Sequence, residues 1–248
     1  MTRFATIAGG VGVAALVLAA CTLPHRHHEE TAALRTISSL NCPDSQGDLT
    51  RKSAAGDGKT CLYGDDNGDE VTLQLIDLSG QTPKSALAPL EAQLRTEMPA
   101  AAGAGAGGGP DNDRVDIDLP GIHIHARGHD QGDSDHASVQ INGADGGKSA
   151  TAADQNGNVA VSATKPGVAV DASDNGAQIS VNEPGSGVRQ SFILASDSPG
   201  PNGYKMVGYQ ARGPAAGPLV VASMKVKSDD HDSLNHDVRK LLNLNVGG

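Results

Sequence analysis

The clearest regularity in the chain is a two-residue alternation of apolar and polar side chains over residues 113–182. Val115, Ile117 and Leu119, for example, alternate with aspartates. The same alternation recurs about every ten residues, at Ile122/Ile124, Val139/Ile141, Val159/Val161, Val168/Val170 and Ile179/Val181. A period of two is typical of β-strands with one apolar face, and such faces must stack to be buried. The pattern therefore predicts a series of short strands.

The C-terminal third predicts stronger strands and a helix. Strands are expected at Gln190–Ala195, Tyr204–Ala211 and Leu219–Lys227, separated by Gly-containing turns, and should form an antiparallel sheet with the preceding ladder. Residues 232–244 then carry an apolar stripe at helical spacing. Its members are Leu234, Val238, Leu241 and Leu242. We expect this helix to cap an open end of the sheet, because an uncovered edge invites aggregation.

Residues 41–98 predict a small α+β module. Short strands are expected at residues 48–51, 60–63 and 71–75, with turns at Asp57-Gly58 and at Asn67-Gly68. Apolar residues then recur at helical spacing up to Met98, at Leu87, Leu90 and Leu94. Because proline breaks a helix interior, the predicted helix begins at Pro89, and its stripe is expected to cover the hairpin strands.

The predicted fold is mainly β with minor α. A signal segment (1–20) and a tether (21–40) precede the module (41–98), a Gly/Ala-rich linker (99–112) and a β-rich body with a C-terminal helix (113–248). The phrase Val-Asp-Ile-Asp-Leu-Pro-Gly-Ile-His-Ile-His-Ala and the ladders after it resemble adhesin-like β-solenoid domains of bacterial envelope proteins. That resemblance implies a solenoid body, whereas the spacing of the Asn-Gly pairs is equally typical of an antiparallel β-sandwich.

The N-terminus resembles the signal of a bacterial lipoprotein. Arg3 precedes an uncharged apolar stretch that ends in Leu18-Ala19-Ala20-Cys21, which is similar to a lipobox. The stretch is shorter than the roughly 20 residues of a spanning helix and contains several glycines, which disfavours a transmembrane anchor. The resemblance implies cleavage before Cys21, acylation of its thiol and stable anchoring. Thr22, rather than aspartate, follows the cysteine, and this implies the outer membrane with the body in the periplasm.

Two further cysteines, Cys42 and Cys61, then lie in an oxidising compartment. A disulfide between them is the favoured interpretation. A two-cysteine metal or redox site is the alternative, but the spacing is far wider than in a C-x-x-C motif.

Composition excludes some partners. The net charge of −10 argues against nucleic acid and against anionic headgroups, so the lipid is the expected membrane contact. Aromatic residues are 2% of the chain and tryptophan is absent, which removes most stacking platforms for sugars or single strands.

Histidines provide the best candidate metal site. His123 and His125 form an H-x-H pair on one face of a predicted strand, with His129 and His136 close behind. Such a set can hold zinc or copper. The competing interpretation is a solvated strand face and loop, because the apolar neighbours of the pair occupy the opposite face.

The acidic loop from Asp65 to Asp69 invites a calcium interpretation. Gly68 is fourth from Asp65, however, rather than sixth, and the required glutamate is missing. A hairpin tip is therefore the favoured interpretation of this loop.

No catalytic motif is complete. Gly147-Lys148-Ser149 lacks the upstream glycine of a phosphate loop, Ser186 is in a turn, and Tyr204 and Tyr209 are expected to pack within strands. The sequence thus predicts a non-enzymatic envelope lipoprotein with a binding or structural role and an envelope protein or polymer as its partner. The alternatives are a periplasmic metal-binding protein that uses the H-x-H pair and, third, a cell-envelope hydrolase.

Overall fold

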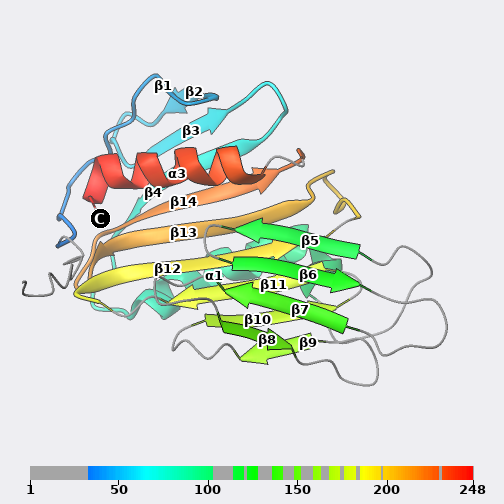
Figure 1. Ribbon diagram of the computed structural model, residues 1–248. Helices are drawn as coiled ribbons and strands as arrows, with labels where there is room; N and C mark the ends of the chain where they lie inside the picture. Colours follow the sequence, from blue (N-terminus) through cyan, green and yellow to red (C-terminus); the bar gives the residue numbers. More distant parts are fainter. Residues whose placement is uncertain are drawn as a thin grey trace, which may run out of the picture. The chain divides into compact units, whose positions relative to one another are not determined.

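The computed structural model describes residues 33–102, 114–119, 122–127, 136–141, 148–151, 159–162, 168–173, 176–182, 185–196, 198–228 and 231–247. These residues form mainly β-structure with a few helices, which confirms the predicted fold class (Figure 1). A ten-stranded sheet has the order β1-β2-β3-β4-β14-β13-β12-β11-β10-β9, and β5-β6-β7-β8 form a four-stranded sheet.

The strands of the large sheet are β1 (Ser45–Gln46), β2 (Leu49–Ala54), β3 (Thr60–Gly64), β4 (Glu70–Ile76), β9 (Val159–Ser162), β10 (Val168–Ser173), β11 (Gly176–Asn182), β12 (Gly187–Ala195), β13 (Met206–Pro214) and β14 (Leu219–Val226). Those of the second sheet are β5 (Arg114–Leu119), β6 (Ile122–Arg127), β7 (His136–Ile141) and β8 (Lys148–Thr151). The helices are α1 (Pro83–Glu97), α2 (Pro99–Ala102) and α3 (His231–Val246).

All strand pairs that the structure describes are antiparallel. Of the two architectures expected for the body, the antiparallel one agrees with this pairing. The strands predicted at 190–195, 204–211 and 219–227 are confirmed as β12, β13 and β14.

The predicted module and the predicted body are joined in one sheet. β4 pairs with β14 over seven register positions, from Leu219↔Ile76 to Lys225↔Glu70. The strands predicted in 41–98 therefore extend the sheet built by the C-terminal strands. The linker between them lies outside the described residues apart from α2 and its neighbours.

Both faces of the sheet are buried where β14 runs. Val220, Ala222 and Met224 point into the core under α3, whereas Leu219 and Val221 belong to the core under α1. Figure 1 shows α3 in front of the sheet and α1 behind it. A strand covered on both sides should be continuously apolar, which explains the unbroken run Leu-Val-Val-Ala at its start.

The prediction for the first helix was wrong in its start and in its packing. α1 begins at Pro83, and its N-cap Thr82 accepts a hydrogen bond from the amide of Ser85, so Thr82-Pro83 is the true start signal. Pro89 lies inside the helix. It is tolerated because Pro89 and Ser85 are both exposed, so the carbonyl that Pro89 leaves without a donor can be reached by water.

The apolar stripe of α1 covers β12–β14 and not the hairpin strands as expected. Leu87, Leu94 and Met98 are buried in one cluster with Phe192 and Tyr209. The hairpin strands β3 and β4 instead turn their apolar side towards α3.

The C-terminal helix is confirmed. α3 spans residues 231–246, and the four predicted stripe residues are buried against the sheet. It covers a face of the sheet rather than an edge. The edges are formed by β1, of two residues, and β9, of four, and short edge strands limit edge-to-edge association.

We predict that Leu241→Ala lowers the free energy of unfolding by about 2–5 kcal/mol, because it leaves a cavity under α3. Leu244→Ala, in the same turn but 41% exposed, should change it by less than about 0.5 kcal/mol. Urea unfolding followed by circular dichroism measures both. Equal effects of the two substitutions would contradict the packing of α3.

Candidate functional site

The predicted histidine site falls only partly within the described backbone. His123 and His125 lie in β6, where they are in register with Asp118 and Asp116 of β5, and His136 begins β7. The side chains of these histidines, together with all of His129, lie outside the described residues. The zinc or copper site therefore stays a prediction.

Cys21 and its signal also lie outside the described residues. In the ranges that the structure does describe, no cluster of three or more His, Cys, Asp or Glu side chains could hold a metal ion. No helix in those ranges is both long and apolar enough to cross a membrane.

The acidic loop 65–69 is a hairpin tip between β3 and β4, as the favoured interpretation has it. A carboxylate oxygen of Asp65 accepts hydrogen bonds from the amides of Asn67 and Asp69, each at 2.9 Å. Gly68 has a φ of +84°, the backbone conformation that an Asn-Gly turn requires.

Asp69 ties this tip to the end of β14. Its side chain is buried, and it accepts hydrogen bonds from the amides of Lys227 (2.7 Å) and Ser228 (3.1 Å) and from the Ser228 hydroxyl (2.6 Å). Protein donors thus occupy both oxygens of the carboxylate.

A small acidic hollow lies between this tip and α3. Its lining residues are Asp48, Leu49, Asp65, Asn67, Asp69, Ser233, Leu234 and Asp237, and it encloses about 20 Å³, enough for about one water molecule. Asp237 accepts from the amide of Asp48 (3.2 Å), and Asp48 accepts from the Ser233 hydroxyl (3.3 Å). These contacts join the β1–β2 turn to α3.

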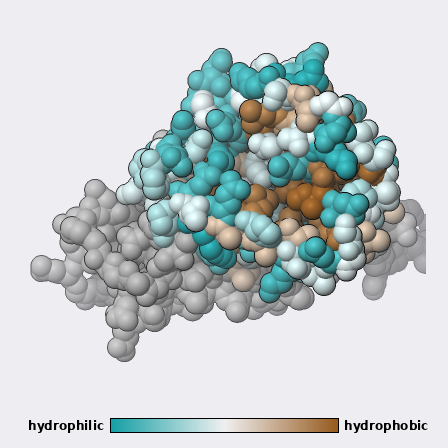
Figure 2. Space-filling view, turned by 180° about the vertical axis from the view of Figure 1, so that it is seen from behind, coloured by the Kyte–Doolittle hydropathy of each residue, from teal (hydrophilic) through white to brown (hydrophobic). Residues whose placement is uncertain are grey.

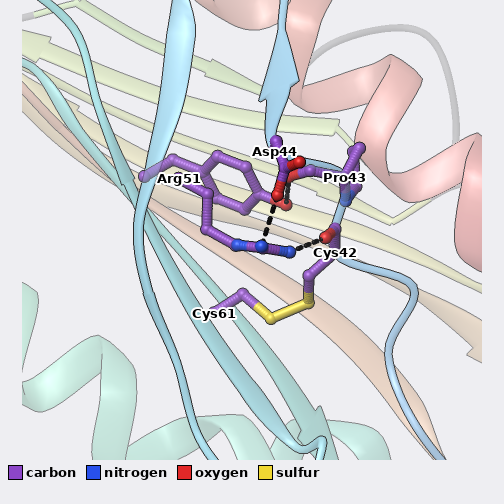
Figure 3. A network of polar contacts seen from close by, with 6 residues as sticks. Cys42, Pro43, Asp44, Arg51 and Cys61 are labelled. Atoms are coloured by element: carbon purple, nitrogen blue, oxygen red, sulfur yellow. Dashed lines mark hydrogen bonds and ion pairs between the residues drawn. A yellow bond between two sulfur atoms is a disulfide. The ribbon is translucent and has the colours of Figure 1, made fainter.

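Cys42 and Cys61 form a disulfide, as predicted (Figure 3). The Arg51 guanidinium donates to the carbonyl of Cys42 and pairs with the Asp44 carboxylate. The hydroxyl of the fully buried Tyr63 donates to the carbonyl of Pro43 at 3.0 Å. The residues on the N-terminal side of the disulfide are thus held by side chains of β2 and β3.

A polar seam runs between α1 and the sheet. The Tyr209 hydroxyl donates to Glu91 (2.8 Å), Lys225 pairs with Glu97 (2.6 Å), and the Arg95 guanidinium lies 4.8 Å from the centroid of the Phe192 ring. Burial, together with the hydrogen bond to Glu91, raises the pKa of Tyr209 well above its ordinary value. Both Tyr204 and Tyr209 are buried, which confirms that they pack within the sheet.

Sequence reasoning missed Asn245, which is 3% exposed. Its Oδ1 accepts from the amide of Asn41 at 2.7 Å, and its Nδ2 donates to the carbonyls of Asn41 (3.1 Å) and Leu241 (2.8 Å). The available signal is that residue 245 continues the apolar stripe of Val238 and Leu241. A polar residue on such a stripe must find partners once it is buried.

We predict that the double variant Cys42→Ala/Cys61→Ala loses about 3 kcal/mol of unfolding free energy, because the disulfide closes a loop of 19 residues. A dithiol reductant should lower the stability of the wild type by a similar amount and leave the variant unchanged. Guanidinium unfolding with and without reductant measures this. Equal stability of wild type and variant would show that the disulfide does not support the fold.

Comparison with known proteins assigns the chain to no family. No protein-family model matches it, and no curated protein or solved structure matches it. The residues of the chain itself are therefore the basis for its proposed function.

Proposed function

We propose that the protein is a lipid-anchored protein of the bacterial cell envelope, held in the outer membrane by acylated Cys21 with its body in the periplasm. The observation that carries the proposal is the order of Arg3, the uncharged apolar stretch and Leu18-Ala19-Ala20-Cys21. Small residues before the cysteine fit a signal peptidase, and the freed thiol is the acceptor of the lipid.

The disulfide supports an extracytoplasmic location. Cys42 is half-buried and Cys61 is buried, and both are bonded to each other. Structural disulfides persist where thiols are not kept reduced, which in bacteria is outside the cytoplasm.

A non-enzymatic role in binding or in envelope structure fits the described residues. The acidic hollow has room for about one water molecule, and its carboxylates accept hydrogen bonds from the protein itself. Figure 2 shows the α1 side, where hydrophobic residues gather in separate patches among hydrophilic ones. Sheet faces and edges of this kind suit a protein or polymer partner better than a small molecule.

Metal binding is a second candidate function. The register of β5 and β6 favours it, because Asp118 is opposite His123 and Asp116 is opposite His125 in the ladder. Imidazole and carboxylate together are ligands that zinc and copper accept.

We expect bacteria that produce the wild type to incorporate labelled palmitate into it, and Cys21→Ser to abolish the label. Inhibition of the lipoprotein signal peptidase should leave the longer precursor. Membrane fractionation should recover the wild type, but not a body from Asn41 onward exported behind a cleavable signal, with the outer membrane. Palmitate-free wild type would contradict the anchor.

We predict for the second candidate that the body retains about one equivalent of zinc or copper after dialysis. His123→Ala/His125→Ala should lose it, and His236→Ala, which removes an exposed histidine of α3, should keep it. Elemental analysis of the three proteins decides the matter. No retained metal in the wild type would eliminate this candidate.

A further inference from the structure

Residues 34–44, here called the strap, lie between the proposed anchor and the first strand. They form neither helix nor strand, yet contacts hold them to the body along their whole length. Leu34, Ile37 and Leu40 are half-buried against the core under α3. The strap is thus a coil with an apolar underside.

The first attachment is at Arg35. Its amide donates to the carbonyl of Val246 at 2.9 Å, and its guanidinium donates to the carbonyl of Leu244 at 3.0 Å. Carbonyls in the last turn of a helix have no intrahelical donor, so they are available as acceptors. The start of the strap therefore binds the end of α3.

The second attachment is at Asn41. The side-chain amide of Asn245 binds both the amide and the carbonyl of Asn41, as a neighbouring strand would. One residue earlier, the amide of Leu40 donates to the carbonyl of Gly58 at 2.8 Å. These contacts link the strap to α3 and to the β2–β3 turn.

The third attachment is covalent. The disulfide of Cys42 with Cys61 fixes the strap to β3, and Arg51 holds Cys42 and Asp44 beside it. The attachments thus differ in kind along the chain. Those before Cys42 are hydrogen bonds and apolar contacts, which can open and close, whereas the disulfide is permanent in an oxidising compartment.

We propose that the strap is a latched length of the membrane tether, which sets how far the body can reach from the lipid. The proposal rests on the proposed anchoring at Cys21. With the strap closed, about 13 residues separate Cys21 from Leu34, and they span at most about 45 Å. With the strap open as far as the disulfide, about 21 residues separate Cys21 from Cys42 and span at most about 75 Å.

The disulfide is then the stop of the latch. Tension from the anchor reaches the strap before it reaches any strand, so the hydrogen bonds of Arg35 and Asn41 open first. Cys42–Cys61 prevents further opening and protects β1 and β2. A strap that only stabilises the fold would instead leave together with the sheet.

The latch is tested by single-molecule pulling of the mature, unlipidated chain. One handle is attached to the thiol of Cys21 and the other to a cysteine introduced at the exposed turn residue Asn202 (Asn202→Cys). We expect a reversible first lengthening of up to about 30 Å, the span of residues 34–42, before the main unfolding event. Reductant should allow a further lengthening from Cys42 towards β2.

Two variants act on the latch from its two sides. Asn245→Ala removes the partner of Asn41, and Ile37→Asp places a charge under the strap without altering α3. Both should lower the force of the first lengthening or abolish it because the strap is already open. The matched controls are Ser38→Asp, an exposed strap residue, and Asn243→Ala, whose side chain binds Arg212 and not the strap. They should behave as the wild type.

Lengthening of the wild type only together with the main unfolding event would overturn the proposal, as would an unchanged first step in both Asn245→Ala and Ile37→Asp. The pulling experiment uses the thiol of Cys21 rather than its lipid. Its failure is therefore distinguishable from failure of the anchor, which palmitate labelling reports separately.

Discussion

The pairing of β4 with β14 is the constraint on which the rest of the fold depends. It brings residues 70–76 beside residues 219–225, which are almost 150 positions away in the chain. Without it, the hairpin strands β2–β4 would have no neighbour on the far side of β4, and α3 would have only half of the surface that it covers. A two-sided core therefore requires this one long-range ladder.

The two helices fulfil different roles on the two faces. α3 packs through apolar side chains and also receives polar contacts from the N-terminal residues, through Asn245 and Asp237. α1 combines an apolar stripe with a polar seam of Glu91, Arg95 and Glu97. The side of the sheet that carries α3 is thus the side on which the beginning and the end of the chain meet, and the disulfide lies there as well.

The sequence predicted what depends on local pattern. Alternation identified the strands from 190 to 227, the stripe of Leu234 and Val238 identified α3, and exclusion of Cys21 left one possible cysteine pair. It did not predict what depends on distant contacts. The spacing of Leu87 and Leu94 indicates a helix but not the strands beneath it. Buried Asn245 acquires its meaning only when Asn41 is beside it.

For the candidate sites, the sequence went as far as residue type and spacing allow. The Asp65–Asp69 loop was correctly interpreted as a hairpin tip because its glycine is misplaced for calcium. The role of Asp69 could not be predicted, because its partners at 227 and 228 lie beyond the β4–β14 ladder. The histidines of β6 stay a prediction whose backbone register is compatible with it.

Native-state hydrogen exchange of the amides of β4 and β14 tests the central claim most directly. If the two strands belong to one cooperative sheet, their most protected amides should exchange with the same opening free energy, equal to that of global unfolding. Exchange of the β4 amides at a much lower opening free energy, with β14 still protected, would contradict the account. It would show that residues 41–98 unfold independently of the C-terminal strands.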